Sequence, residues 1–294
     1  MPQKSFTGTG VAIVTPFRND SSIDFKALEK ILEHIISGGV DYVVVLGTTG
    51  ESVTLSKDEK KAVINFVIDT TDQRIPVVVG IGGNNTQEIL STINTTEFDN
   101  VDAILSVSPY YNKPSQTGVY LHFKAIATAS PVPVIIYNVP GRTGMNIAAE
   151  TTLKLAGEFN NIIAIKEASG NFTQIMQIIK QKPRNFQVIS GDDAITLPMI
   201  AIGATGAISV VANAFPKEFS AMVNHALNGE LVKANTLHYK LLDITNALFE
   251  EGSPPGIKAV LEILKLARNN VRLPLAPVSE KHYAKLDGLV KKIK

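Results

Sequence analysis

Short, nearly continuous apolar runs alternate with amphipathic stretches along most of the chain. The apolar runs are rich in β-branched residues and bounded by Gly, Pro or Asp, which is typical of strands buried on both faces of a sheet. They recur at roughly 20 to 35 residues, the spacing of βα units. Eight strands are predicted, over residues 11–17, 42–47, 76–82, 103–109, 134–140, 162–168, 186–193 and 206–213.

The stretches between these runs carry helix patterns and helix start signals. Ser56 and Glu59 have the spacing of a capping box, and residues 85–88 give another start signal. Asp24 precedes a stripe of apolar residues on one helical face, formed by Phe25, Leu28, Leu32, Ile35 and Ile36. No Gly-x-Gly-x-x-Gly turn follows the first strand, which favours a (β/α)8 TIM barrel over a doubly wound α/β sheet.

After about residue 228 the strand pattern stops. Residues 229–249, 254–267 and 279–293 read as three helices separated by Pro-containing turns. We therefore predict a catalytic barrel over residues 1–228 and a C-terminal helical appendage over residues 229–294. The apolar faces of these helices need a surface to cover them, on the barrel or on another subunit.

Composition narrows the class of ligand. With 294 residues, 45% of them hydrophobic, the chain can bury a large core. The net charge of +1 argues against nucleic-acid or membrane partners and leaves a small molecule. The chain has no cysteine, no leader pattern in its first ten residues and no apolar stretch that could span a bilayer, so a cytoplasmic location is expected. The five histidines are scattered, so no metal site is expected.

Polar residues follow five of the predicted strands, at the end where TIM barrels carry their functional groups. Lys166 follows four apolar residues, so its amine would lie in a partly dehydrated barrel mouth that lowers its pKa and makes it a nucleophile towards carbonyl compounds. A lysine that simply reaches solvent is the alternative. Tyr137 could carry protons beside that lysine or be an ordinary core tyrosine. Thr48 and Thr49, on a Gly-bounded turn, suit a small carboxylate or a helix cap.

Several motifs occur together in a fixed order, namely GTTGES, PYYNKPSQ, YNVPGRTG, IKEASG, SGDD and GAISV, and the match extends into the SPPGIKAVL and RLPLAP segments. On these motifs the chain closely resembles the dihydrodipicolinate (4-hydroxy-tetrahydrodipicolinate) synthases of the N-acetylneuraminate lyase superfamily, nearly from end to end. The resemblance implies a class I aldolase-type lyase of lysine (diaminopimelate) biosynthesis with no metal or organic cofactor. Lys166 would form a Schiff base with pyruvate, whose enamine attacks L-aspartate 4-semialdehyde.

The resemblance also implies roles for the other site residues. Thr48, Tyr137 and Tyr111 match the family's proton relay, and the tyrosine at position 111 would come from a neighbouring subunit. Activity would then require a dimer, and the family usually forms a dimer of dimers. Thr49 matches the cradle for the pyruvate carboxylate, together with Thr48.

Arg142 is expected over the mouth of the barrel. The Pro140-Gly141 turn redirects the chain there, and the planar donors of the guanidinium can hold a second carboxylate. Aspartate semialdehyde has such a carboxylate, whereas sialic-acid lyases and their relatives generally lack this arginine. Gly191 and Ile208 match positions whose backbone carbonyls line the pocket near the lysine.

Feedback inhibition by lysine is expected to be weak or absent. Lys57 and Lys60 occupy places where inhibited family members often carry histidine or acidic residues, and added cations would oppose a bound lysine ammonium. The chain nevertheless retains residues that match the family's allosteric site at the dimer interface, which are Ser52, Asn84, Glu88 and Tyr110.

Two alternative functions stay open. A related pyruvate-dependent aldolase or lyase would act on N-acetylneuraminate or a 2-keto-3-deoxy sugar acid, and Arg142 argues against it. A non-catalytic ligand sensor on the same barrel would not need the nucleophile at Lys166.

Overall fold

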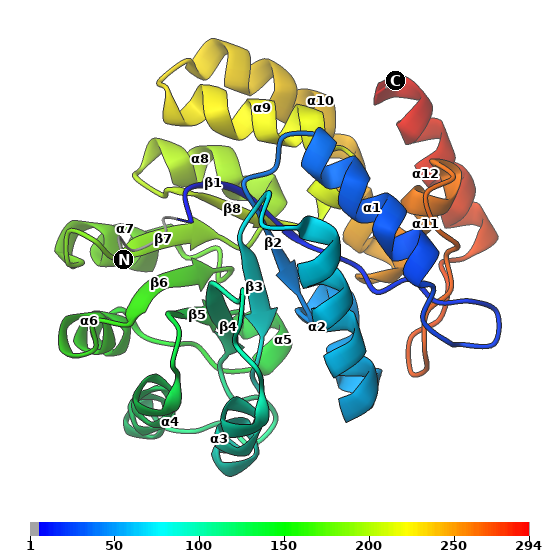
Figure 1. Ribbon diagram of the computed structural model, residues 1–294. Coiled ribbons are helices and arrows are strands. Elements are labelled where there is room, and N and C mark those ends of the chain that lie inside the picture. The colour runs from blue at the N-terminus through cyan, green and yellow to red at the C-terminus, as the bar shows by residue number, and fades with distance from the viewer. Residues whose placement is uncertain (1–5, 294) are drawn as a thin grey trace.

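The strands of the computed structural model, which describes residues 6–293, follow one another in chain order and close into one barrel (Figure 1). Each strand pairs in parallel with the next, and the last pairs with the first. The predicted TIM barrel is therefore confirmed. Residues 1–5, which belong to the amino-terminal stretch without a leader pattern, lie outside the described residues. The strands are β1 (Gly8–Ala12), β2 (Tyr42–Val45), β3 (Val77–Gly80), β4 (Ala103–Val107), β5 (Val134–Asn138), β6 (Ile162–Glu167), β7 (Gln187–Ser190) and β8 (Gly206–Ser209).

Helices surround the barrel and begin where the sequence predicts. Asp24 and Asn85 cap their helices through side-chain oxygens, and Ser56 with Glu59 forms the complete capping box. The helices of the barrel are α1 (Phe25–Ser37), α2 (Lys57–Thr71), α3 (Thr86–Thr95), α4 (Gln116–Ala129), α5 (Pro140–Thr143), α6 (Ala149–Glu158), α7 (Phe172–Gln181), α8 (Thr196–Ala201) and α9 (Pro216–Leu227). Short 3-10 turns are η1 (Thr48–Gly50), η2 (Ser52–Thr54), η3 (Asp193–Ile195) and η4 (Val211–Asn213).

The first strand differs from its prediction. The sequence predicts a strand over residues 11–17, whereas β1 ends at Ala12 and residues 13–17 form a buried loop. The Asn213 side chain makes two hydrogen bonds to the backbone where this loop begins. Its amide nitrogen donates to the Ala12 carbonyl (2.9 Å), and its amide oxygen accepts from the Val14 N–H (3.2 Å). The apolar run over residues 11–17 is therefore explained by the burial of this loop. The first residues of β1, Gly8 to Gly10, lack the apolar pattern by which strands are predicted.

Two apolar layers result from the alternation of side chains along each strand. In β2, Val43 and Val45 belong to the layer between barrel and helices, and Val44 belongs to the barrel interior. The interior is filled by large aliphatic and aromatic side chains, including Tyr42, Leu105, Ile135, Ile189 and Ile208. It is therefore a packed core, and a ligand can enter only at its ends.

The three predicted C-terminal helices are confirmed as α10 (Leu231–Glu250), α11 (Pro255–Ile263) and α12 (Glu280–Ile293). Helix α10 packs on α9 and α12, while α11 is almost entirely buried between the turn after β8 and its helical neighbours (Figure 1). The division of the chain at residue 228 stays a prediction. Within residues 6–293, no helix has the length and apolar character needed to cross a bilayer.

Candidate active site

A cavity of about 1070 Å³ opens at the carboxyl ends of the strands and continues along α2 and α3. Its lining combines apolar side chains with polar groups from the strand ends and with many polar and charged residues of α2 and α3. Six of the eight residues proposed for catalysis or substrate binding line it, and they are Thr48, Thr49, Tyr137, Arg142, Lys166 and Gly191.

Lys166 lies in the barrel mouth with only 5% of its surface exposed. Burial lowers the pKa of Lys166 to about 8, the carboxylate of Asp193 opposes this effect, and the charge of Arg142 adds to it. The ammonium nitrogen lies 4.3 Å from the centroid of the Tyr137 ring. An amine with this pKa is partly neutral near physiological pH and can attack a carbonyl carbon.

A bulge in the pairing of β5 with β6 turns Lys166 towards the interior. The register shifts between Val134 and Ile135, so Ile163 and Ala164 both face the barrel interior. Regular alternation from Ile163, without the extra residue, would place Lys166 among the helices outside the barrel.

Tyr137 stands beside Lys166 because the two Cα atoms are partners in the β5–β6 register. Burial raises the pKa of Tyr137 to about 12, although the charge of Arg142 and a hydrogen bond with Thr48 oppose the effect. The phenol is therefore protonated at neutral pH. A protonated phenol hydrogen-bonded to a hydroxyl can pass a proton to or from a reacting group.

The turn η1 supplies both threonines. Thr49 is buried, Thr48 is exposed, and both residues line the cavity. The first N–H groups of a helical turn have no carbonyl partner inside it. Two hydroxyls and such N–H groups can together bind a small carboxylate.

Arg142 lies on the short helix α5, which Pro140 begins and Gly144 ends in the left-handed conformation (φ 71°). The guanidinium is exposed on the cavity wall, where one of its nitrogens lies 3.5 Å from the carbonyl oxygen of Ser253. Its charge reaches both Lys166 and Tyr137, since it lowers the pKa of each. A carboxylate bound near Lys166 and Tyr137 can pair with this cation.

Gly191 makes room for the lysine. A Cβ at this position would lie 2.8 Å from the Ala168 Cβ and 3.0 Å from the Lys166 Cε, so any larger residue would displace the Lys166 side chain. Ile208 is different, because it packs in the barrel interior and does not belong to the cavity lining. Val210, two residues later, lines the cavity instead.

Comparisons with known proteins agree over the whole chain. The sequence model of the Dihydrodipicolinate synthetase family matches residues 5–293. The chain belongs to this family. A 4-hydroxy-tetrahydrodipicolinate synthase of Flavobacterium psychrophilum is 52% identical over 290 residues, which is 99% of each chain.

Solved structures of dihydrodipicolinate synthases have the same fold. The chloride-inhibited enzyme of Acinetobacter baumannii complexed with pyruvate superposes with a TM-score of 0.95 at 40% identity, covering 98% of this chain and 99% of that one. The enzyme of Cyanidioschyzon merolae with lysine bound gives 0.94 at 36% identity, with 98% of both chains covered. The resemblance read from the sequence motifs is thereby confirmed.

Tyr111 stands apart from the other family positions in this chain. It is 84% exposed, has a positive φ of 70° and does not line the cavity, whereas its neighbour Tyr110 does. Within one chain, Tyr111 therefore does not join Thr48 and Tyr137.

The positions expected to form an allosteric site also line this cavity, which extends along α2 and α3. The side chain of Asn84 donates a hydrogen bond to the Tyr110 carbonyl at 3.4 Å. Lys57 and Lys60 line the same cavity. The four allosteric candidates that line it are Ser52, Asn84, Glu88 and Tyr110.

Asp193 was not assigned from the sequence; it does not line the cavity but acts on Lys166 through its charge. Its carboxylate is buried and accepts hydrogen bonds from the N–H groups of Val210 and Val211, both at 2.9 Å. Burial raises the pKa of Asp193, and its charge in turn raises that of Lys166. The available signal was a pair of acidic residues shortly after the end of β7 at Ser190. Across the described part of the chain, no group of three or more His, Asp or Glu side chains could hold a metal ion.

Proposed function

We propose that this chain is a 4-hydroxy-tetrahydrodipicolinate synthase that condenses pyruvate with L-aspartate 4-semialdehyde. The observation that carries the proposal is the buried Lys166 amine against the Tyr137 ring, with a pKa lowered to about 8. The family membership and the 52% identity to a synthase of that name support the choice of reaction.

The neutral amine of Lys166 attacks the keto carbon of pyruvate, and loss of water from the carbinolamine leaves a protonated imine. Tyr137, hydrogen-bonded to Thr48, supplies the proton that the leaving hydroxyl needs. Removal of a methyl proton gives the enamine, whose carbon forms the new C–C bond with the aldehyde. The amino group of the semialdehyde then attacks the imine carbon, which closes the ring and releases Lys166.

Two carboxylates need two separate binding groups. We assign the pyruvate carboxylate to Thr48 and Thr49, because both residues line the cavity with Lys166 and the Thr48 side chain is hydrogen-bonded to Tyr137. We assign the semialdehyde carboxylate to Arg142, whose exposed guanidinium stands on the cavity wall. Gly191 admits the lysine side chain, and Ile208 supports the interior below it.

Assembly and location are part of the proposal. An exposed Tyr111 held at a strained backbone angle suits a residue that enters a neighbouring subunit's cavity, so we propose a dimer as the active unit and a dimer of dimers as the complete assembly. The lack of cysteine suits the reducing cytoplasm. We also propose that lysine inhibits weakly or not at all, because Lys57 and Lys60 add positive charge to the cavity.

The test is turnover of pyruvate with aspartate semialdehyde, coupled to NADPH oxidation by the reductase that uses the product. Activity that is lost in Lys166→Ala and strongly reduced in Arg142→Ala supports the synthase. A borohydride-trappable pyruvate adduct without consumption of semialdehyde would instead favour a related aldolase acting on sugar-derived aldehydes. Binding of pyruvate without any adduct would favour a sensor.

A further inference from the structure

A buried ion pair links the C-terminal appendage to the turn that carries Thr48 and Thr49. The Glu51 carboxylate directly follows this turn, and the Lys258 ammonium on α11 donates to it, with both side chains only 1% exposed. Lys258 also donates to the Asn270 carbonyl at 2.9 Å and lies 4.1 Å from the centroid of the Phe17 ring. The pair therefore joins segments that are far apart in the sequence.

Glu51 is fixed through both its side chain and its backbone. The second carboxylate oxygen accepts from the backbone N–H of Arg272 at 3.0 Å, and the Glu51 N–H closes the turn on the Thr48 carbonyl at 3.1 Å. Its backbone is left-handed (φ 52°, ψ 34°), a conformation that is costly for a residue with a side chain. Contacts of the carboxylate must hold the residue there.

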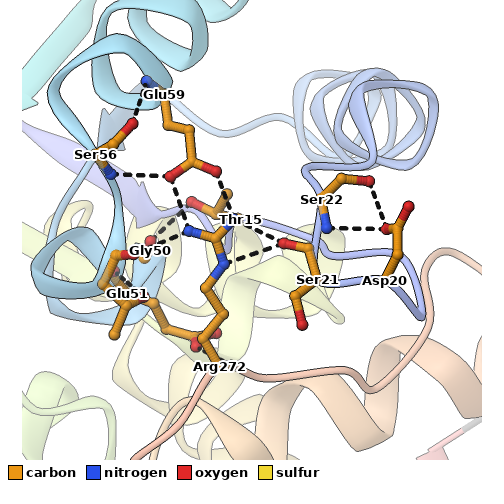
Figure 2. Close-up of polar contacts among 10 residues, drawn as sticks. Thr15, Asp20, Ser21, Ser22, Gly50, Glu51, Ser56, Glu59 and Arg272 are labelled. Atoms are coloured by element: carbon orange, nitrogen blue, oxygen red, sulfur yellow. Dashed lines mark hydrogen bonds and ion pairs between the residues drawn. The ribbon is translucent and has the colours of Figure 1, made fainter.

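Arg272 also binds the segment that follows Glu51, as Figure 2 shows. Its guanidinium donates to both carboxylate oxygens of Glu59 and to the carbonyls of Thr54 and Ser21. Arg272 holds the pKa of Glu59 down to about 2, so the pair is charged at neutral pH. Thr15 donates to the Gly50 carbonyl at 2.8 Å, also visible in Figure 2. Thr15, Lys258 and Arg272 thus hold the carboxyl end of the turn and the segment that follows it.

Stability alone is a weak reason for such a pair. Desolvation of two charges offsets most of their attraction, and apolar replacements of buried pairs are often as stable. An apolar pair, however, cannot make the directional hydrogen bonds that hold Glu51 in its strained backbone conformation. Burial lowers the pKa of Lys258 to about 8 while Glu51 opposes this, so the ammonium predominates at neutral pH.

We propose that Glu51 and Lys258 are positioning residues: the C-terminal appendage holds the Glu51 carboxylate and thereby sets the Thr48–Thr49 turn where it binds the pyruvate carboxylate and meets Tyr137. Neither residue touches the substrate. The inference rests on the proposed function, since it concerns how well the turn serves that reaction. It makes the helical appendage a working part of the active site.

The experiment measures apparent KM for pyruvate, kcat and the rate of borohydride trapping in Lys258→Met and in the double variant Glu51→Gln/Lys258→Met. The double variant removes both buried charges, so we expect it to fold even if an unpaired Glu51 unfolds the single variant. The matched control is Ile257→Ala, which weakens α11 at the neighbouring buried position and leaves the ion pair in place.

We expect the KM for pyruvate to rise about tenfold or more in both pair variants, with slower trapping and a smaller change in the KM for semialdehyde. Ile257→Ala should lower the melting temperature and leave the KM for pyruvate within about twofold of wild type. An unchanged KM for pyruvate in the folded pair variants would overturn the proposal. So would loss of folding in both pair variants while the control folds, because the pair would then serve stability. A wild-type protein inactive in the coupled assay would instead refute the proposed function.

Discussion

The Lys166→Met variant is expected to be more stable than the wild-type protein at neutral pH. Lys166 is buried in the barrel mouth, and burial lowers its pKa from 10.5 to about 8. Methionine has nearly the same length, carries no charge and fits an apolar surrounding. The substitution therefore removes a desolvated ammonium and leaves the packing almost unchanged.

The size of the effect follows from the two pKa values. They differ by about 2.5, and one pKa unit corresponds to about 1.36 kcal/mol, so the charged lysine destabilises the fold by about 3 kcal/mol at pH 7. Between pH 8 and 10.5 the unfolded chain binds more protons at this site than the folded chain, so wild-type stability rises with pH across that window. The advantage of the variant should be full below pH 8 and absent above 10.5.

Urea unfolding of both proteins at pH 7 and at about pH 10, at one protein concentration, measures this difference. Taking the difference cancels other groups that titrate in the same range, Lys258 among them. Lys233→Met, at a largely exposed lysine, is the control and should change stability little at either pH. A Lys166→Met protein that is no more stable than wild type at pH 7, or whose advantage persists at high pH, would refute the reasoning.

Three further predictions concern binding and rate. The rate of borohydride-trapped pyruvate adduct should rise with pH and level off above about 8, because only the neutral Lys166 amine attacks. Arg142→Ala should lower kcat/KM for aspartate semialdehyde about a hundredfold, through a lost charge-assisted contact, and still form the pyruvate adduct. Titration calorimetry should detect weak lysine binding or none, and Lys57→His/Lys60→Glu should strengthen it because the cations are removed.

Each of these has a clear contrary outcome. A trapping rate that is flat from about pH 6 to 9 would mean that Lys166 is not the titrating nucleophile. Loss of the pyruvate adduct in Arg142→Ala would place the guanidinium at the first substrate. Tight lysine binding by the wild-type protein would show that Lys57 and Lys60 do not weaken the allosteric site.

The sequence predicts the barrel because eight apolar runs at regular spacing have few other ways to bury both faces. It also predicts Lys166, Tyr137 and Thr48, since each lies near the end of a strand or begins the turn that follows. The direction of the Lys166 side chain, towards the barrel interior, is harder to predict from the sequence. It depends on the bulge at the β5–β6 pairing, which no residue pattern in β6 announces.

The pair of Glu51 and Lys258 shows a second kind of limit. Lys258 sits in an apolar helix and Glu51 follows a Gly-bounded turn, so each was visible as a charged residue in an unusual place. Their partnership spans 207 positions of the chain and exists only once the appendage packs on the barrel. The hydrophobic periodicity of a segment predicts which face of a helix or strand is buried, but it does not predict which residues pack against that face.

The covalent step at Lys166 is central to the proposed function. Incubation of the wild-type protein with pyruvate and borohydride, followed by peptide mass spectrometry with and without aspartate semialdehyde, tests it. The predicted result is one reduced pyruvate adduct, located on Lys166, whose yield falls when the semialdehyde draws the enamine forward. An adduct on another lysine, or none while the enzyme turns over, would contradict the account.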